Sequence, residues 1–332
     1  MSVPATGDIR HDWSADEVRA LFDAPFTELL FAAQQVHRRY FDPAQVELAS
    51  LVSVKTGACP EDCAYCPQSV RFQTDVEPHA LMPVASVREA ARRAREAGVA
   101  RLCLGAAWRG PKARDMPRLR EMIAAVREQG LEVCLSAGLL SDGQARELAD
   151  AGLDYYNHNL DTSPEYYPEI ITTRRYDERL STLAHVRDAG LRVCCGGIVG
   201  LGEGETDRAE LLRTLANLPA HPESVPINQL IPVPGTPMAE AGPPDELAIV
   251  RTIAVARILM PRARVRLSAG RTQMSDAVQA LCVLAGANSL FFGDVLLTAE
   301  NPDETADRAL LARLGLEVEA PQREPALAGG EG

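Results

Sequence analysis

The sequence has no excess of basic residues. It contains 34 lysines and arginines against 46 aspartates and glutamates, which gives a net charge of −12. Binding to nucleic acid or to an acidic membrane surface needs a basic face. We therefore expect neither a nucleic acid nor a membrane as a partner.

The sequence also lacks a recognisable secretory signal and a long uninterrupted apolar run. Residues 1–13 have no basic start followed by an apolar core, which predicts a cytoplasmic protein. The most apolar long stretch, 278–297, contains polar residues such as Gln279 and Asp294, so we expect a helix and a strand there rather than a membrane span. Disulfides are rare in a reducing cytoplasm. Metal or redox chemistry is then the leading explanation for the eight cysteines.

The alternation of apolar runs and amphipathic patterns predicts an α/β fold with a parallel sheet. After an N-terminal helical stretch at 14–39, four helical patterns end at Gly98, Gly130, Gly152 and Gly190, each just before a strand. The predicted strands are 46–54, 99–105, 131–136, 153–160, 191–199, 224–230, 263–268 and 288–292. The predicted helices between them are 86–97, 117–129, 143–151, 176–189, 207–217, 245–260 and 273–285.

The length of the repeating region indicates how the sheet closes. Residues 46–300 match the ~250 residues typical of a (β/α)8 TIM-type barrel. An open doubly wound sheet is the alternative, but no G-x-G-x-x-G fingerprint follows an early strand. We predict an N-terminal helical extension at 1–45, the barrel at 46–315 and a mobile tail at 316–332.

Three cysteines follow the first predicted strand in a loop that contains glycine and prolines. Cys59, Cys63 and Cys66 are spaced C-x3-C-x2-C. Three thiolates this close can bind one cluster or metal, and the loop lies at the catalytic end of a barrel. A structural zinc site or an electron-carrying cluster would need a fourth ligand. Zinc with a distant fourth ligand and incidental loop cysteines remain the alternatives.

This motif, with Tyr65 just before its third cysteine, resembles that of the radical S-adenosylmethionine (SAM) superfamily. The resemblance implies that Cys59, Cys63 and Cys66 hold a [4Fe–4S] cluster. The iron without a cysteine ligand would bind the amino and carboxylate groups of SAM. One electron would then release a 5′-deoxyadenosyl radical.

A second set of cysteines lies in the predicted strands. Cys103, Cys134 and Cys194 and the guanidinium of Arg266 are each flanked by apolar residues. Since strand side chains alternate, these four should point into the barrel if their neighbours pack against the helices. A lone buried cysteine behaves as a small hydrophobe, but an inward arginine needs an anion. A second iron–sulfur site is therefore plausible.

These residues and several longer runs resemble the biotin synthase family over residues 40–305. In that family the inner positions ligate a [2Fe–2S] cluster, which implies that Cys103, Cys134, Cys194 and Arg266 do so here. Cys195 adjoins Cys194, but alternation turns only one of them inward, and Cys194 aligns with the family. Cys282 fits core packing. The matching runs are GAAWRGP (105–111), YYNHNLDTSPEYY (155–167), GGIVGLGE (196–203), PINQLIPVPGTP (226–237) and VRLSAGR (265–271).

The polar residues of the fourth predicted strand indicate a wet cavity. Asn157, Asn159 and Asp161 share one parity, as expected for residues that line a binding site; an exposed strand end is the alternative. By resemblance, Asn159 and Asp161 contact the ribose of SAM or nearby groups, and Arg179 contacts its carboxylate. Asn159 would also lie near the substrate. The resemblance also assigns Tyr65, Gly196, Gly200 and Glu203 to the cofactor.

Asn228 and Thr298 are the remaining substrate contacts that the resemblance implies. The Asn228 amide offers a donor and an acceptor to a cyclic urea. Ala299 stands where some relatives carry a second threonine, which puts one minor contact in doubt. His158 by itself fits a structural residue better than a catalytic one.

The implied activity is radical insertion of sulfur into dethiobiotin, with the inner cluster as sulfur donor and Arg266 tuning it. A reduced flavodoxin or ferredoxin and a homodimeric state are implied as well. A radical SAM enzyme with another substrate would not require the inner cysteines and Arg266. A non-catalytic iron–sulfur protein would need four ligands to each cluster and no cavity for an adenosyl group.

Overall fold

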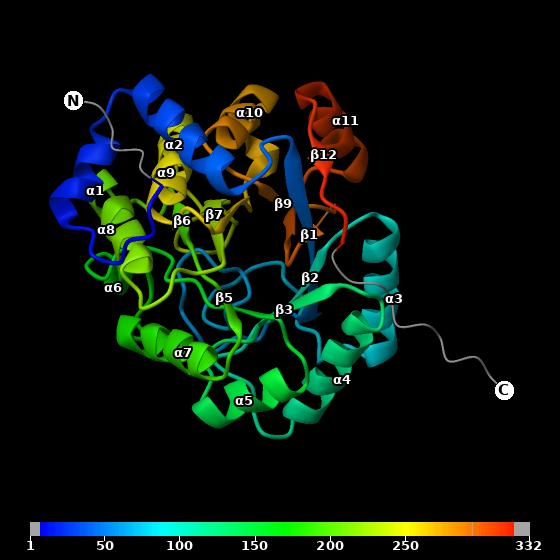
Figure 1. Ribbon diagram of the computed structural model, residues 1–332. Coiled ribbons are helices and arrows are strands. Elements are labelled where there is room, and N and C mark those ends of the chain that lie inside the picture. Colours follow the sequence, from blue (N-terminus) through cyan, green and yellow to red (C-terminus); the bar gives the residue numbers. More distant parts are fainter. Residues whose placement is uncertain (1–6, 294, 322–332) are drawn as a thin grey trace.

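The computed structural model describes residues 7–293 and 295–321. Its centre is a closed barrel of parallel strands, in which the first and last staves pair (Figure 1). The fold class predicted from the sequence is confirmed. The barrel strands are β1 (Gln45–Lys55), β2 (Arg101–Ala106), β3 (Glu132–Ser136), β4 (Tyr155–Asn157), β5 (Arg192–Cys194), β6 (Gly197–Val199), β7 (Ser224–Gln229), β8 (Arg264–Leu267) and β9 (Ser289–Phe291).

Helices surround the barrel, and the space between the two layers is the main apolar core (Figure 1). Leucine and valine side chains on the outer faces of the strands fill this core, as the alternation of strand residues predicts. The surrounding helices are α3 (Val84–Glu96), α4 (Met116–Arg127), α5 (Asp142–Asp150), α6 (Tyr167–Ile170), α7 (Tyr176–Asp188), α8 (Glu205–Ala216), α9 (Glu246–Leu259), α10 (Asp276–Leu284) and α11 (Glu304–Leu314), with the 3₁₀ turn η1 (Arg271–Gln273).

The turns that join four of the helices to the following strands lie at the glycines predicted from the sequence. Gly98, Gly130, Gly152 and Gly190 all have positive φ angles, between 73° and 87°. Glycine adopts this left-handed conformation without steric cost and so ends each helix before the next strand. The predicted role of these four glycines is confirmed.

The N-terminal extension contains two helices, α1 (Ala15–Phe22) and α2 (Phe26–Tyr40), rather than one continuous helix. Pro25 separates them, because a proline disfavours helical backbone in the residue before it. Ser14 and Glu17 form a capping box at the start of α1. In Figure 1 both helices lie on the side of the barrel that carries α8 and α9.

Some elements were not expected from the sequence. The fifth predicted strand, 191–199, is interrupted, so β5 and β6 pair separately with β7. A short hairpin, β10 (Val295–Leu296) and β11 (Ala299–Glu300), follows β9, and α11 was missed. A further strand, β12 (Glu317–Val318), pairs with the start of β1, so the first residues of the predicted tail lie on the sheet. The rest of that tail, from residue 322, lies outside the described residues.

None of the helices in the described residues is long and apolar enough to cross a membrane.

Candidate active site

The outer cysteine loop follows β1 and folds back on itself. The Cys59 amide donates to the Gln68 carbonyl over 2.9 Å, and the Cys66 amide donates to the Cys63 carbonyl over 2.9 Å. Gly57 has a φ of 66°, which turns the chain sharply out of the strand. These contacts bring the three thiols to the mouth of the barrel.

Burial makes the outer thiols poor acids in the absence of a cation. Loss of solvent raises the pKa of Cys59 and Cys63, and it raises the pKa of Cys66 to about 12. A metal ligand must be a thiolate, and iron supplies the positive charge that would release the proton. The loop therefore suits a metal-bound state better than three free thiolates.

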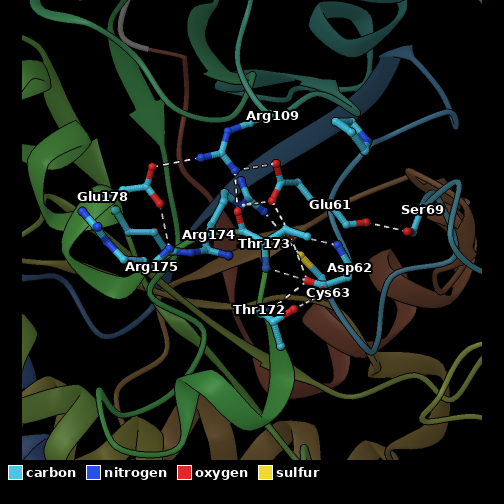
Figure 2. A network of polar contacts seen from close by, with 12 residues as sticks. Glu61, Asp62, Cys63, Ser69, Arg109, Thr172, Thr173, Arg174, Arg175 and Glu178 are labelled. Carbon is cyan, nitrogen blue, oxygen red and sulfur yellow. Dashed lines mark hydrogen bonds and ion pairs between the residues drawn. The ribbon is translucent and has the colours of Figure 1, made fainter.

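A network of polar contacts fastens this loop to the segment that precedes α7 (Figure 2). The Asp62 carboxylate accepts hydrogen bonds from the backbone amides of Thr172 and Thr173 over 3.0 and 3.1 Å. The Glu61 carboxylate accepts from Arg109 Nη1 over 3.1 Å and from Thr173 Oγ1 over 2.5 Å. This network was not predicted from the sequence, because its members lie far apart along the chain and match no cysteine spacing.

The inner cysteines come together in the interior of the barrel. The strand register places Cys103 directly beside Cys134, and all three inner thiols belong to one buried cluster that includes Tyr155. Cys195 belongs instead to the core between strands and helices. The predicted inward direction of Cys103, Cys134 and Cys194 is confirmed, as is the burial of Cys282.

Hydrogen bonding and nearby arginines bias two of the three inner thiols, Cys103 and Cys194, towards ionisation. A hydrogen bond from Cys134 and the charge of Arg266 lower the pKa of Cys194 to about 5, although burial opposes the shift. The same hydrogen-bond donor lowers the pKa of Cys103, while the pKa of Cys134 itself is raised. A deprotonated thiol is the form that binds iron.

Arg266 is fully buried beside these thiols. Its Nε donates to Ser289 Oγ over 2.8 Å, and its Nη2 donates to the Glu47 carboxylate over 2.8 Å. Its Nη1 is buried and has no hydrogen-bond partner among the described residues. A buried unsatisfied donor is costly, so this atom favours an acceptor placed against it. The site fits a thiolate-bound cluster in contact with the guanidinium.

Glu47 is a partner of Arg266 that was not predicted from the sequence. We expected the inner cluster to be the anion that the arginine needs, but Glu47 already supplies one. Glu47 also pairs with Arg101 at 3.1 Å, and Arg101 pairs with Glu132 at 2.9 Å. These residues form a charged floor below the inner cysteines. Glu47 interrupts an apolar run in β1, which is the signal that could have revealed it.

Both cysteine sets line one cavity of about 350 Å³. The cavity is therefore a single chamber between the outer loop and the inner thiols. Of the residues assigned by resemblance to SAM or the substrate, those that line this chamber are Tyr65, Asn159, Asp161, Arg179, Asn228 and Thr298.

The predicted SAM contacts are linked to one another. Arg179 Nη2 lies 2.7 Å from Asp161 Oδ2, and the Tyr65 hydroxyl donates to the same oxygen over 2.9 Å. Asn159 Oδ1 accepts from the Gly196 amide over 3.1 Å. The side chains of Asp161 and Arg179 are almost fully buried, so the chamber wall presents a preorganised pair of opposite charges. Their binding roles stay predictions.

Asn228 is held by the backbone on both sides. Its Nδ2 donates to the Gly197 carbonyl over 2.9 Å, and its Oδ1 accepts from the Ala269 amide over 3.2 Å. An amide nitrogen has a second hydrogen and an amide oxygen a second lone pair. The side chain can therefore be fixed in place and still bind a cyclic urea.

Gly196, Gly200 and Glu203 do not line the chamber, so their assignment to the cofactor stays a prediction. The Gly200 amide donates one bifurcated hydrogen bond to the two Glu203 carboxylate oxygens, each at 3.1 Å, and Arg208 donates another. These contacts close the loop after β6.

Gly196, between β5 and β6, lies close to the backbone of β7, and replacing it by alanine is expected to destabilise the fold. A Cβ atom there would lie 1.9 Å from the Pro226 carbonyl oxygen, so the backbone would have to shift. We expect a loss of at least about 1–3 kcal/mol in the free energy of unfolding, measured by urea denaturation. Gly143→Ala is the control, because no atom of the described residues other than its chain neighbours and its own helix backbone lies within 4 Å of its Cβ position. Equal stability of the two variants would contradict the prediction.

No three or more histidine, cysteine, aspartate or glutamate side chains in the described residues have the arrangement that holds a single metal ion. A cluster makes a different demand, because its cysteines bind different iron atoms. The two cysteine sets stay predicted cluster sites.

Two family models match consecutive parts of the chain. The Radical SAM superfamily matches residues 53–215, and the Biotin and Thiamin Synthesis associated domain matches residues 226–317. A protein named biotin synthase from Alkalilimnicola ehrlichii is 64% identical over 94% of this chain and 94% of its own length. Another of that name from Halorhodospira halophila is 62% identical over 92% and 94%.

Solved structures share the fold at low identity. Methylornithine synthase (PylB) aligns with a TM-score of 0.77 and 20% identity over 92% of this chain and 94% of that one. The hydrogenase maturase HydG from Carboxydothermus hydrogenoformans aligns with a TM-score of 0.79 and 16% identity over 93% and 76%. At these identities the two structures support the barrel fold alone.

Proposed function

The chain belongs to the biotin synthase family, and we propose that it inserts sulfur into dethiobiotin by radical chemistry inside its barrel. The outer loop holds a [4Fe–4S] cluster through Cys59, Cys63 and Cys66. The observation that carries the proposal is the shared chamber of about 350 Å³, which the outer and inner cysteines both line. A small substrate in this chamber contacts both sites at once.

SAM binds between the outer loop and β4. When bound, the outer cluster supplies the electron that cleaves SAM into a 5′-deoxyadenosyl radical able to abstract hydrogen from an unactivated carbon. Arg179 presents a buried positive charge to the SAM carboxylate, and Asp161 keeps that guanidinium in place. Asn159 and Asp161 supply acceptors for the ribose hydroxyls.

The inner site holds a [2Fe–2S] cluster that serves as the sulfur source. Cys103, Cys134 and Cys194 would be its thiolate ligands, and Arg266, whose buried Nη1 has no hydrogen-bond partner in the described part of the chain, would be the fourth ligand. Glu47 and Ser289 fix the guanidinium from the opposite side. Arg266 would thereby help to hold the cluster and tune it electrostatically.

The chamber positions dethiobiotin and excludes water from the reacting carbons. Asn228 hydrogen bonds to the ureido ring, and Thr298 contacts the substrate tail; both residues line the cavity. Leu51 and Phe291, which also line the chamber, pack against the inner thiols as apolar neighbours. Exclusion of water protects a reactive intermediate from side reactions.

Anaerobic reconstitution tests the proposed function. The protein is loaded with iron and sulfide and incubated with SAM, a reductant and dethiobiotin, and both 5′-deoxyadenosine and biotin are measured. We expect both products. Formation of 5′-deoxyadenosine without biotin would favour another substrate for the same radical chemistry. Absence of both products would favour a non-catalytic iron–sulfur protein.

The proposal extends to the cellular setting of the enzyme. The described cysteines are free thiols, which suits a reducing cytoplasm. The outer cluster needs one electron for each SAM cleaved, which a reduced flavodoxin or ferredoxin supplies. A homodimer follows from the family resemblance, and light scattering on the purified protein tests it.

A further inference from the structure

One arginine contacts a cysteine of the outer loop directly. Arg174 Nη2 lies 3.3 Å from Cys63 Sγ, and the arginine side chain is only 9% exposed. Arg174 also lines the chamber. A charged donor that hydrogen bonds to a thiolate forms a stronger bond than a neutral donor. The Arg174 guanidinium can therefore interact electrostatically with a cluster bound by the Cys63 thiolate.

A buried carboxylate holds Arg174 from the other side. Glu61 Oε2 lies 3.2 Å from Arg174 Nε, and Glu61 Oε1 lies 3.1 Å from Arg109 Nη1. The Glu61 side chain is only 2% exposed. Figure 2 shows these side chains between the outer loop and the start of α7. The Arg174 guanidinium beside Cys63 is thus paired with the Glu61 carboxylate on its other side.

We propose that Arg174 is a positioning residue that sets the reduction potential of the outer cluster through its hydrogen bond to Cys63, with Glu61 as the opposing charge. This proposal rests on the outer [4Fe–4S] cluster of the proposed function. Hydrogen bonds to the sulfur ligands and the charge around a cluster are what tune its potential. A reduced cluster carries one more negative charge, so a nearby guanidinium stabilises the reduced form.

The loop has other contacts that account for its shape without Arg174. Asp62 accepts hydrogen bonds from the backbone of Thr172 and Thr173, and the Cys59 amide is bonded to Gln68. The contact from Arg174 to Cys63 is therefore not needed to close the loop. This separation allows an electrostatic role to be distinguished from a structural one.

Two substitutions are expected to move the potential in opposite directions. Arg174→Gln removes the positive charge and should lower the midpoint potential of the outer cluster by at least about 59 mV. For one electron this shift corresponds to a tenfold change in the reduced-to-oxidised ratio. Glu61→Gln removes the negative charge and leaves Arg174 uncompensated, so the potential should rise. A loop that was merely distorted would not give opposite signs in the two variants.

Further variants keep the comparison interpretable. Arg174→Lys retains the charge and should shift the potential less than Arg174→Gln does. Arg175→Gln is the matched control, because the Arg175 side chain is 76% exposed and pairs with Asp177 away from the cysteines. It should leave the potential unchanged. If Arg174→Gln assembles no cluster, Glu61→Gln and Arg174→Lys still give the sign and the charge dependence.

The experiment is a spectroscopic redox titration of each anaerobically reconstituted protein without substrate. Shifts of the same sign in Arg174→Gln and Glu61→Gln, or shifts no larger than in Arg175→Gln, would overturn the role of Arg174. If the parent forms biotin but these potentials do not move, only the present proposal fails. If the parent assembles no outer cluster, the proposed function fails, and the role of Arg174 with it.

Discussion

Replacing Cys134 by alanine is expected to abolish biotin formation while SAM is still cleaved. Cys134 lies beside Cys103 in the strand register and belongs with Cys103 and Cys194 to one buried cluster, so its loss removes one predicted ligand of the inner site. The outer cysteines belong to a separate loop and keep their own contacts. Iron and sulfide content, 5′-deoxyadenosine and biotin should be measured on the same anaerobic sample.

Cys195→Ala is the control for this prediction. Cys195 is fully buried, but it faces the core between strands and helices and not the chamber. Its truncation should leave iron content and both products close to those of the parent, with only a small loss of stability. If Cys134→Ala still forms biotin at the parental rate, the inner cysteines are not the sulfur-donating site.

Replacing Glu47 by glutamine is expected to cost about 3–5 kcal/mol in the free energy of unfolding of the metal-free protein. Glu47 lies between the buried guanidiniums of Arg101 and Arg266, and the substitution leaves both without this anion. Unpaired buried charge is among the most destabilising changes in a protein. Urea denaturation of the parent and the variant measures the difference.

The pH dependence of Glu47 has a defined sign. Burial favours the neutral acid, but Arg101 and Arg266 outweigh it and lower the pKa of Glu47 from 4.5 to about 2. An acid with a depressed pKa stabilises the fold above its ordinary pKa, and this contribution is lost as the pH falls through the lowered value. The difference in the free energy of unfolding between the parent and Glu47→Gln should therefore decrease as the pH falls from 4.5 to about 2.

An exposed ion pair provides the control for Glu47. Asp142 pairs with Arg146 on the surface of α5, where both side chains are about half exposed or more. Surface pairs contribute about 0–1 kcal/mol, so Asp142→Asn should change stability little. A Glu47→Gln variant as stable as Asp142→Asn would contradict the importance of the charged floor.

The barrel could be predicted because its signals are local and repeated. Each predicted strand is an apolar run, and the helix-ending glycines mark the joints. The split between β5 and β6 was not predicted, because a continuous apolar run does not show where pairing with β7 is interrupted. The buried ion pair between Asp307 in α11 and Arg271 was not predicted either, because the two residues lie in segments distant in sequence.

The site was predictable where a spacing or an alternation carries it. The C-x3-C-x2-C motif could be recognised from its spacing alone, and the inward direction of Cys103 and Cys134 from the alternation of neighbouring residues. The contacts of Glu61 and Arg174 were not predicted, because charged residues in loops are common. Only folding brings these two residues close to a thiol. Partners across the barrel are determined by tertiary packing, which no local pattern encodes.

The measurement that tests the central claim most directly follows the inner cluster and the product together. Anaerobically loaded protein is given SAM, reductant and dethiobiotin but no added sulfide, and the visible absorbance and the biotin formed are recorded over time. We predict that biotin appears in proportion to the loss of the inner cluster's absorbance. Biotin formed while that absorbance stays intact would contradict the account.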